Sequence, residues 1–434
     1  ARCAGGRRGH RRGPRGGAGR AGARRPLTGN TPTPPMQWNP GNWQSAKHVQ
    51  GAGHLMLVQV GNWVYCLDLA EKKERWTKNL LGEGVNLPGN QIFDSGNGEV
   101  YVNYQDGTRQ VIGGVTLIQP GYAAVITRDG LEAVEPMTRQ PLWVRRNVTD
   151  RTRIYGDSRY ILMVELDANS TTPSSMKLVR AVDGMTVDGY KDPTNALKAA
   201  KSYKMYGRTA LLSEEAGEKK TLRLLDLATG TDVWKREYDA KSITIKSHRP
   251  EWCGFVKSNG EVDIFATSTG QPVAKYALDP KYGAAHLAGA TEAQLFADSD
   301  RFYVTLDRPA LGNAQAIRRN LQYNYSLKTT MVNGPMYAFE QTSGNRLWFV
   351  DGVLENQWLM QERFGDLPVL IAAAPSFDRN GNQSNQYKVV VIEKDQGAVR
   401  FNSAFPNVNQ YFQSMPVDLK NGEINLHRYD ARLK

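Results

Sequence analysis

Asp378, Asn380 and Asn382 form the one stretch of the sequence whose side chains are typical of a metal site. Oxygen-bearing side chains that alternate around Gly381 are the pattern of a calcium-binding loop. The stretch lacks the further carboxylates that such a loop normally has, so a polar loop between two strands is the preferred interpretation. We therefore predict no metal site in this chain and keep calcium at these three residues as the alternative.

The residues that carry other chemistry are scattered along the chain. The six histidines lie at positions 10, 48, 54, 248, 286 and 427, and we expect them to be exposed or hydrogen-bonded because their spacing fits no metal site. The three cysteines include no CxxC pair, so we expect buried thiols at Cys66 and Cys253. The GxSxG, HExxH, Walker and dinucleotide-binding motifs are absent. The sequence therefore predicts no catalytic residue and favours a protein that is not an enzyme.

A second candidate site lies in a long interruption of the strand pattern, residues 308–335. Arg318, Arg319, Tyr323 and Tyr325 make part of this insertion both basic and aromatic. Long loops on a rigid scaffold commonly carry its binding function. We predict that these four residues contact a protein partner, and the alternative is a packed or mobile insertion without a binding role.

The net charge of +12 comes mostly from the N-terminal end of the chain. Residues 1–26 contain nine arginines and no acidic residue, which leaves the other residues close to neutral. A segment of Arg, Gly, Ala and Pro cannot bury enough apolar surface to fold, so residues 1–35 are expected to be a disordered leader and linker. Nucleic-acid binding by this leader is an alternative that we do not favour, because it has one RGG triplet and no aromatic residue for base stacking. No apolar region of a secretory signal follows its charges.

The rest of the chain, residues 36–434, reads as one folded domain. A content of 40% hydrophobic and 23% charged residues is sufficient for a core, and the many glycines and short Val, Ile, Tyr and Thr runs favour strands. No apolar run approaches 18 residues, so no transmembrane segment is expected.

One repeat runs through this domain and would position the candidate residues. The clearest copies have an alternating strand, an acidic residue, a turn residue four positions later, and then an aromatic residue four positions after the turn; they are residues 64–76, 131–143, 222–234, 336–348 and 389–401. Residues 177–190 and 262–276 are weaker copies. In chain order, the turn residues of the seven copies are Lys72, Arg139, Gly184, Gly230, Gly270, Gly344 and Gly397. The shorter spacings, from 40 to 46 residues, match one four-stranded propeller blade per copy.

An eighth copy, residues 421–434, aligns with residues 259–271 and stops where its last strand should begin. Residues 36–50, with Trp38 and Trp43, are available to supply that strand, so one blade would be built from both chain ends. We therefore predict an all-β fold, a β-propeller of eight four-stranded antiparallel blades in a closed monomeric ring, with seven blades as the alternative. Trp76, Trp143, Trp234, Trp348 and Phe401 are the aromatic residues expected to be buried between neighbouring blades.

The pattern of aliphatic strand, Asp or Glu, TG turn and Trp resembles the tryptophan-docking repeat of the PQQ-like quinoprotein β-propellers. That resemblance covers residues 36–434 and implies two kinds of activity. One is a dehydrogenase that uses PQQ with Ca²⁺ in the central channel, and the other is a non-enzymatic scaffold such as the BamB-like assembly factors. The alcohol dehydrogenases of the family are expected to carry adjacent cysteines, which this sequence lacks.

We therefore expect a non-catalytic, protein-binding propeller without a cofactor. A PQQ- and Ca²⁺-dependent dehydrogenase is the first alternative, and nucleic-acid binding through the leader is the second. The resemblance also implies an extracytoplasmic, periplasmic location.

Overall fold

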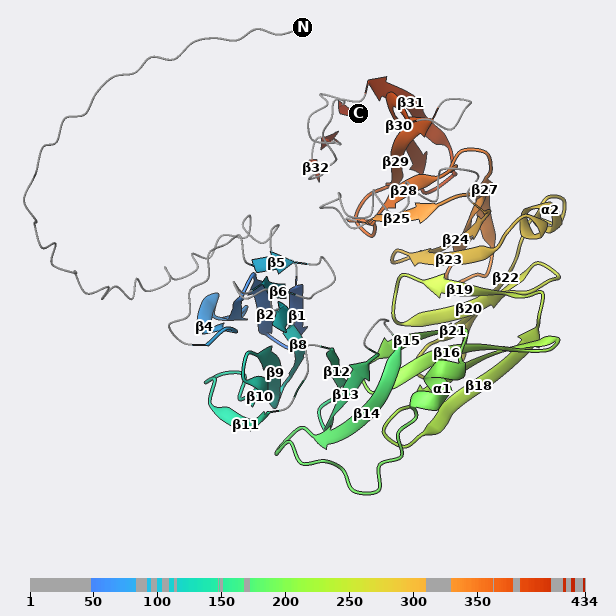
Figure 1. Ribbon diagram of the computed structural model, residues 1–434. Helices are drawn as coiled ribbons and strands as arrows, with labels where there is room; N and C mark the ends of the chain where they lie inside the picture. Colours follow the sequence, from blue (N-terminus) through green and yellow to red (C-terminus); the bar gives the residue numbers. More distant parts are fainter. Residues whose placement is uncertain are drawn as a thin grey trace, which may run out of the picture. The chain divides into compact units, whose positions relative to one another are not determined.

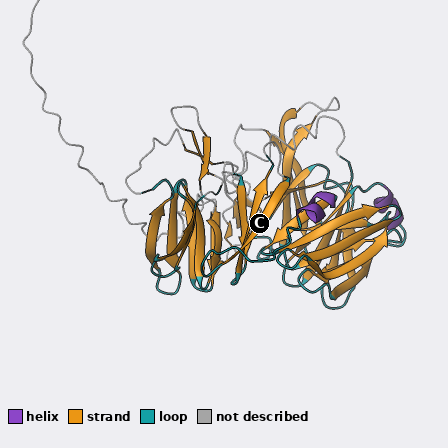
Figure 2. Ribbon diagram, turned by 60° about the horizontal axis from the view of Figure 1, so that its bottom comes forward, coloured by secondary structure: helices purple, strands orange, loops and turns teal. Residues whose placement is uncertain are grey.

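The computed structural model describes residues 48–82, 92–94, 100–103, 109–112, 115–146, 148, 151–167, 172–309, 329–361, 363–377, 383–406, 417–418, 423–425 and 432–433. These residues form strands almost throughout, with two short helices (Figures 1 and 2). Neither of those helices is long and apolar enough to cross a membrane.

Most strands form antiparallel sheets in which neighbouring strands are also consecutive in the sequence. Blade I contains β1 (His48–Ala52), β2 (Leu55–Val60), β3 (Trp63–Asp68) and β4 (Lys73–Asn79). Blade II contains β8 (Val115–Gln119), β9 (Tyr122–Thr127), β10 (Gly130–Val134) and β11 (Pro141–Arg145). Blade III contains β12 (Thr152–Gly156), β13 (Tyr160–Leu166) and β14 (Pro173–Arg180), and helix α1 (Thr194–Ala199) follows it. Blade IV contains β15 (Ser202–Tyr206), β16 (Thr209–Ala216), β17 (Lys219–Asp226) and β18 (Thr231–Asp239).

Blades V and VI share one eight-stranded sheet, because β19 pairs in parallel with β23. Blade V contains β19 (Ile243–Ser247), β20 (Trp252–Val256), β21 (Glu261–Ala266) and β22 (Pro272–Ala277), followed by helix α2 (Gly283–Ala288). Blade VI contains β23 (Glu292–Ala297), β24 (Arg301–Asp307), β26 (Met336–Glu340) and β27 (Arg346–Val350). Blade VII contains β28 (Gln357–Met360), β29 (Val369–Phe377), β30 (Gln383–Glu393) and β31 (Val399–Pro406). Strand β25 (Thr329–Val332) comes from the insertion and joins blade VII as a fifth strand.

Two smaller sheets complete the described part. One contains β5 (Ile92–Asp94), β6 (Val100–Asn103) and β7 (Arg109–Ile112), between blades I and II in the sequence. The other contains β32 (Val417–Asp418), β33 (Glu423–Asn425) and β34 (Arg432–Leu433), in the region of the eighth copy. The predicted all-β fold of four-stranded antiparallel blades is confirmed, and the chain has a β-propeller fold.

The predicted turn of each repeat is confirmed in its backbone conformation. All seven turn residues have a positive φ, from 52° at Lys72 to 77° at Gly344. In six copies the pairing of the last two strands shifts register near the end of the third strand, as at Cys66/Leu67 and Leu224/Leu225. One bulge and one left-handed residue therefore recur in copies whose sequences have diverged.

Hydrophobic clusters join each blade to the next. Val64 of blade I packs in one cluster with Val125 of blade II, and Leu212 of blade IV shares another with Leu162 of blade III. The clusters continue through blades V, VI and VII. Both faces of a blade are thus covered, which explains why its central strands are apolar at nearly every position.

Four indoles also bridge consecutive blades. Trp76, Trp143, Trp234 and Trp348 donate their indole N–H to the main-chain oxygens of Pro136, Ala181, Thr267 and Lys394, at 2.7 to 2.8 Å. Each acceptor lies three residues before the turn residue of the next copy. In blade V the aromatic is Tyr276, whose hydroxyl donates to the oxygen of Glu340.

Blade III departs from the pattern at its fourth strand. That strand is reduced to a single bridge between Val179 and Thr186, after which the chain turns away toward α1. The carboxylate of Asp192 accepts the main-chain N–H of Met176, so a side chain replaces part of the missing strand. The aromatic of this copy, Tyr190, falls two places late in the sequence, as does Tyr276 in blade V.

The predicted ring closure lies largely outside the described residues. Trp38 and Trp43 are not described, and neither are residues 1–35. The end of the segment 36–50 forms β1 and pairs with β2 in blade I. The eighth copy was predicted to end where its last strand should begin. Within it, the two-residue strand β34 pairs with β33. Eight blades and a blade shared by both chain ends stay predictions.

Candidate functional site

The base of the insertion 308–335 contains buried polar residues that hydrogen-bond to one another. Arg318, Arg319, Tyr323 and Tyr325 themselves lie outside the described residues. The structure describes where the insertion leaves β24 and where it returns through β25. The site is therefore built from those two ends.

Asp307 and Asn333 tie the two ends of the insertion together. The main-chain N–H of Asn333 donates to Asp307 Oδ1 at 2.8 Å, and its side-chain Nδ2 donates to the oxygen of Arg308 at 2.9 Å. The main-chain N–H of Arg308 donates back to the oxygen of Asn333. Asn333 Oδ1 accepts the N–H of Asn356 in the segment before β28. The entry and exit of the insertion are thus fixed to each other and to blade VII.

Strand β25 then carries the chain across from blade VI to blade VII. Its residues Thr329–Val332 pair with Met360–Gln357 of β28 in antiparallel register. The insertion therefore extends blade VII by one strand, at the edge that β28 would otherwise form.

Gln294 of β23 holds β25 from the side opposite β28. Its Nε2 donates to the oxygen of Met331 at 2.7 Å and to the carboxylate of Asp307. Its Oε1 lies 2.7 Å from Nε2 of His248, the residue after β19. Gln294 is 4% exposed, so these hydrogen bonds are made inside the protein. They link its side chain to β25, to the end of β24 and to His248.

The partners of Gln294 orient its side chain toward His248. The oxygen of Met331 can only accept a hydrogen bond, so the Gln294 amide nitrogen must face it and the amide oxygen must face His248. His248 Nε2 therefore donates to Gln294. His248 Nδ1 lies 3.1 Å from the Gln361 amide and 3.5 Å from the Thr330 hydroxyl, and the imidazole stacks on the ring of Phe296.

Asp307 is a buried carboxyl group that accepts hydrogen bonds from the main chain of Asn333 and the side chain of Gln294. Burial raises its pKa, and the hydrogen bonds from Asn333 and Gln294 oppose that shift in part. The raised pKa is typical of functional sites, although buried structural carboxyls show it as well.

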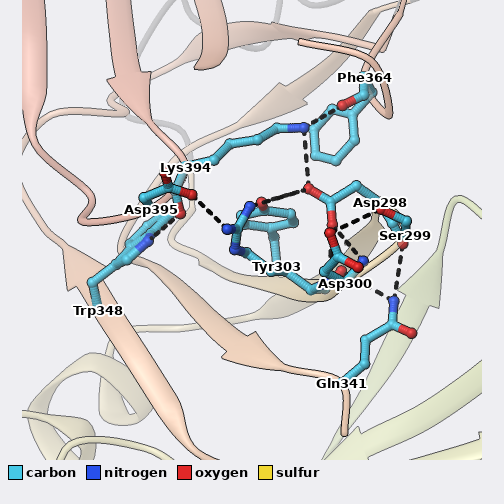
Figure 3. A network of polar contacts seen from close by, with 10 residues as sticks. Asp298, Ser299, Asp300, Tyr303, Gln341, Trp348, Phe364, Lys394 and Asp395 are labelled. Carbon is cyan, nitrogen blue, oxygen red and sulfur yellow. Dashed lines mark hydrogen bonds and ion pairs between the residues drawn. The ribbon is translucent and has the colours of Figure 1, made fainter. Parts of the chain in front are cut away.

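A second buried polar network joins blades VI and VII (Figure 3). Lys394 is 2% exposed, and its Nζ lies 3.1 Å from Oδ2 of Asp298, which also accepts the hydroxyl of Tyr303 at 2.8 Å. The ammonium group also donates to the oxygen of Phe364 and lies over its ring. Burial lowers the pKa of Lys394, whereas the pKa of Asp298 is lowered by Tyr303, main-chain amides and Lys394 against the opposing effect of burial.

The predicted calcium loop, Asp378, Asn380 and Asn382, lies outside the described residues. It joins β29 to β30, which pair antiparallel, so its place in the chain is a connection between two strands. In the described ranges, no group of three or more His, Cys, Asp and Glu side chains could hold a metal ion.

The sequence analysis did not single out His248, Gln294, Asp307 or Asn333. One signal was available in the pattern, because Gln294 is a polar residue on the buried face of the apolar strand EAQLFA. Asp307 is the last residue of β24, directly before the insertion. The contact of His248 with both has no sequence signal, because 46 residues separate it from Gln294.

The prediction of buried thiols is confirmed, since Cys66 and Cys253 are both buried. Burial raises the pKa of Cys66 to about 12 and that of Cys253 to about 11. We expect neither thiol to react with a disulfide reagent in the native protein at neutral pH, because the thiolate is the reactive form. Both should react once a denaturant unfolds the chain. Rapid labelling of either thiol without denaturant would contradict this assignment.

No protein-family model matches the chain, and no curated protein sequence matches it. Solved structures resemble it weakly. BamB from Moraxella catarrhalis is 14% identical, with 87% of this chain and 92% of that chain covered and a TM-score of 0.32. The dihydro-heme d1 dehydrogenase NirN is 12% identical, with 83% and 67% covered and a TM-score of 0.30. A eukaryotic initiation factor is 12% identical, with 83% and 88% covered and a TM-score of 0.38.

Likeness at this level carries no argument about activity, because β-propellers host unrelated functions. The chain is therefore identified as a β-propeller by the arrangement of its own sheets. Its function has to be argued from the insertion and its base.

Proposed function

We propose that this chain is a non-catalytic β-propeller that binds a protein partner through its insertion. The observation that carries the proposal is the base of the insertion, where Asp307, Asn333 and Gln294 fix both ends through buried hydrogen bonds. A loop with a rigid base loses less conformational entropy on binding than one that is free at both ends. Arg318, Arg319, Tyr323 and Tyr325 are of the residue types enriched at protein interfaces.

The two arginines suggest that the partner presents acidic groups, and the two tyrosines suggest an adjoining apolar surface. Trp76, Trp143, Trp234, Trp348 and Phe401 are proposed to hold the blades together rather than to bind a ligand. The lack of adjacent cysteines favours the non-enzymatic branch of the PQQ-like superfamily, and the resemblance of the repeat favours an extracytoplasmic location; both are parts of the same proposal.

Replacing Arg318, Arg319, Tyr323 and Tyr325 together by Ala tests this function. The full-length protein is first used to isolate its partner, and the affinity of the purified pair is then measured by calorimetry. We expect the fourfold variant to bind at least about tenfold more weakly, since single interface anchors often contribute 2 kcal/mol or more. Replacing Lys219 and Lys235, two exposed residues of blade IV, by Ala is the matched control and should leave the affinity unchanged.

Two results would overturn the proposal. One is equal binding by the fourfold variant and the wild type. The other is a large thermal shift with PQQ and Ca²⁺ together with dye-linked oxidation of an alcohol or sugar, which would support a dehydrogenase. Salt-sensitive binding of RNA or DNA that disappears when residues 1–26 are deleted would instead assign a function to the leader.

A further inference from the structure

We propose that α2 and Arg308, the first residue of the insertion, form one docking surface, on which Lys281, Tyr282 and Arg308 contact an acidic protein partner. The proposal rests on the proposed function, because this partner is the one that the insertion binds. It extends the binding site to residues that the structure describes.

α2 and the insertion are attached at neighbouring strand ends of blade VI. Glu292, the first residue of β23, follows α2 by four residues and pairs with Asp307, the last residue before the insertion. Where the insertion returns to the blade, Met336 of β26 pairs with Thr305 of β24. The helix and both ends of the insertion are therefore attached at the same end of blade VI.

A buried histidine joins α2 to the start of the insertion. His286 is 5% exposed, and its Nε2 lies 3.2 Å from Oδ2 of Asp351, the residue after β27. Oδ1 of the same carboxylate accepts a hydrogen bond from Nη2 of Arg308 at 3.1 Å. A Cβ atom on Gly289, directly after α2, would lie 3.7 Å from Nε of Arg308, so the arginine side chain lies against the end of the helix. Asp351 thus holds α2 and the start of the insertion together.

Tyr282 is an exposed aromatic residue with a rigid support. It is 42% exposed, and the centroid of its ring lies 5.6 Å from that of Phe349 on β27 and 6.3 Å from that of His286. A large side chain that is already held in place loses little conformational entropy when a partner covers it. Tyrosine is also one of the residue types that contribute most to binding at protein interfaces.

The ion pairs of this surface leave a positive charge for the partner. Asp279 and Asp351 are its carboxylates, and each already pairs with an arginine. The ammonium nitrogen of Lys281 lies 4.8 Å from the centroid of the Tyr282 ring and makes no ion pair with the residues that the structure describes. A cation beside an aromatic ring suits a carboxylate next to an apolar side chain. The arginines and tyrosines of the insertion suggest the same partner chemistry.

Glu292 is the next acidic residue after α2, and its side chain points away from the helix. Ala293 packs in the same hydrophobic cluster as Leu287 of α2. Successive residues of a strand face opposite sides of the sheet, so Glu292 faces the side away from that cluster. Its carboxylate therefore lies on the side of the sheet opposite to α2.

Ala285 supplies the first test, because it is exposed and lies on one face of α2 with Tyr282 and Gly289. Ala285→Glu and Ala285→Lys introduce side chains of opposite charge without removing a buried side chain. The full-length variants are titrated by calorimetry with the partner isolated through the wild-type protein. We expect Ala285→Glu to bind at least about tenfold more weakly than Ala285→Lys, and the difference should shrink as the salt concentration rises.

The second test removes the contact residues of the helix. Lys281→Ala combined with Tyr282→Ala should weaken binding about tenfold. Leu69→Ala combined with Lys73→Ala is the matched control in a turn of blade I, because Leu69 is 41% exposed and the Lys73 side chain 51% exposed. This control should leave the affinity unchanged. The two Ala285 variants keep the proposal testable even if Tyr282→Ala loosens α2.

Four results would overturn the proposal. If both Ala285 variants bind like the wild type while the fourfold variant of the insertion binds weakly, α2 is not part of the surface and the proposed function stands. Equal weakening by Ala285→Glu and Ala285→Lys would exclude an acidic partner. Self-association of the wild type that Ala285→Glu abolishes would assign the surface to a second copy of this chain. Failure of the wild type to retain any protein partner would overturn this proposal together with the proposed function.

Discussion

Lys394→Met is expected to lower the free energy of unfolding by about 3 kcal/mol, the lower end of the cost of removing one member of a buried ion pair. Asp298 is 4% exposed and would keep its charge without the ammonium group that lies 3.1 Å away. The Tyr303 hydroxyl and the main-chain N–H of Asp300 would still donate to it, and the Arg301 guanidinium, 3.9 Å away, would remain as a more distant and partly exposed counter-charge. Denaturant unfolding at about pH 7 measures the loss.

A second substitution separates the charge from the packing. Asp298→Asn removes the charge, keeps an oxygen for the two main-chain donors and offers an N–H to the Tyr303 oxygen. The double variant should therefore be markedly more stable than Lys394→Met alone. Equal stability of the single and double variants would show that packing of the lysine stem, and not the buried pair, is what the first substitution destroys.

The pH dependence of the Lys394→Met effect follows from the shifted pKa of Asp298. In the wild type this pKa is lowered, so ionised Asp298 contributes stability above the unfolded pKa, near 4, and that contribution is lost as pH falls through the folded pKa. Without Lys394, the buried charge has only the more distant Arg301 opposite it, so protonation relieves part of its cost instead. The difference in stability between wild type and variant should thus be largest near pH 7 and shrink toward about pH 4.

Gly270→Ala is expected to destabilise the protein by about 1–3 kcal/mol more than Gly230→Ala, the range typical of overpacking. Both glycines occupy the turn of the repeat, with φ of 67° and 72°, so both substitutions incur the same backbone strain of about 1–2 kcal/mol. A Cβ atom on Gly270 would lie 2.6 Å from the Trp234 ring, whereas one on Gly230 would meet nothing within 4 Å. The ring would have to move, and its hydrogen bond to Thr267 would be lost.

Further variants test whether the tryptophan ring is the cause. Gly397→Ala should behave like Gly270→Ala, because its Cβ would lie 2.6 Å from the Trp348 ring. In a Trp234→Leu background the extra effect of Gly270→Ala should largely disappear. Equal losses for Gly270→Ala and Gly230→Ala in thermal unfolding would mean that the glycines serve backbone conformation alone.

Much of the fold could be predicted because each copy of the repeat carries its own local signals. Each copy contains an alternating strand, a residue that tolerates positive φ and a large aromatic residue within about 15 residues. The structure places all seven turn residues in the left-handed region. Even Lys72 and Arg139, which are not glycines, adopt that conformation at the predicted positions. The irregular blade III was not predicted, because its aromatic residue is displaced by two positions just as Tyr276 is in the four-stranded blade V.

The candidate site was much less predictable, because its contacts join residues of different copies. Gln294, His248 and Asp307 lie in three separate strands or strand ends, and no spacing in the sequence relates them. The insertion was recognisable as a break in the repeat, but its strand β25 and the pairing of β25 with blade VII were not. The Lys394–Asp298 pair was missed for the same reason, since 96 residues separate the two charges.

By itself, the sequence determined the class of fold, the turn of each repeat and the place of the insertion. These features depend on interactions within one blade, where neighbours in sequence are neighbours in space. Only the tertiary structure decided which oxygen each tryptophan contacts, how Lys394 is paired and which residues fix the base of the insertion. Those contacts form between blades, so they depend on the stacking of the whole array, which no local pattern encodes.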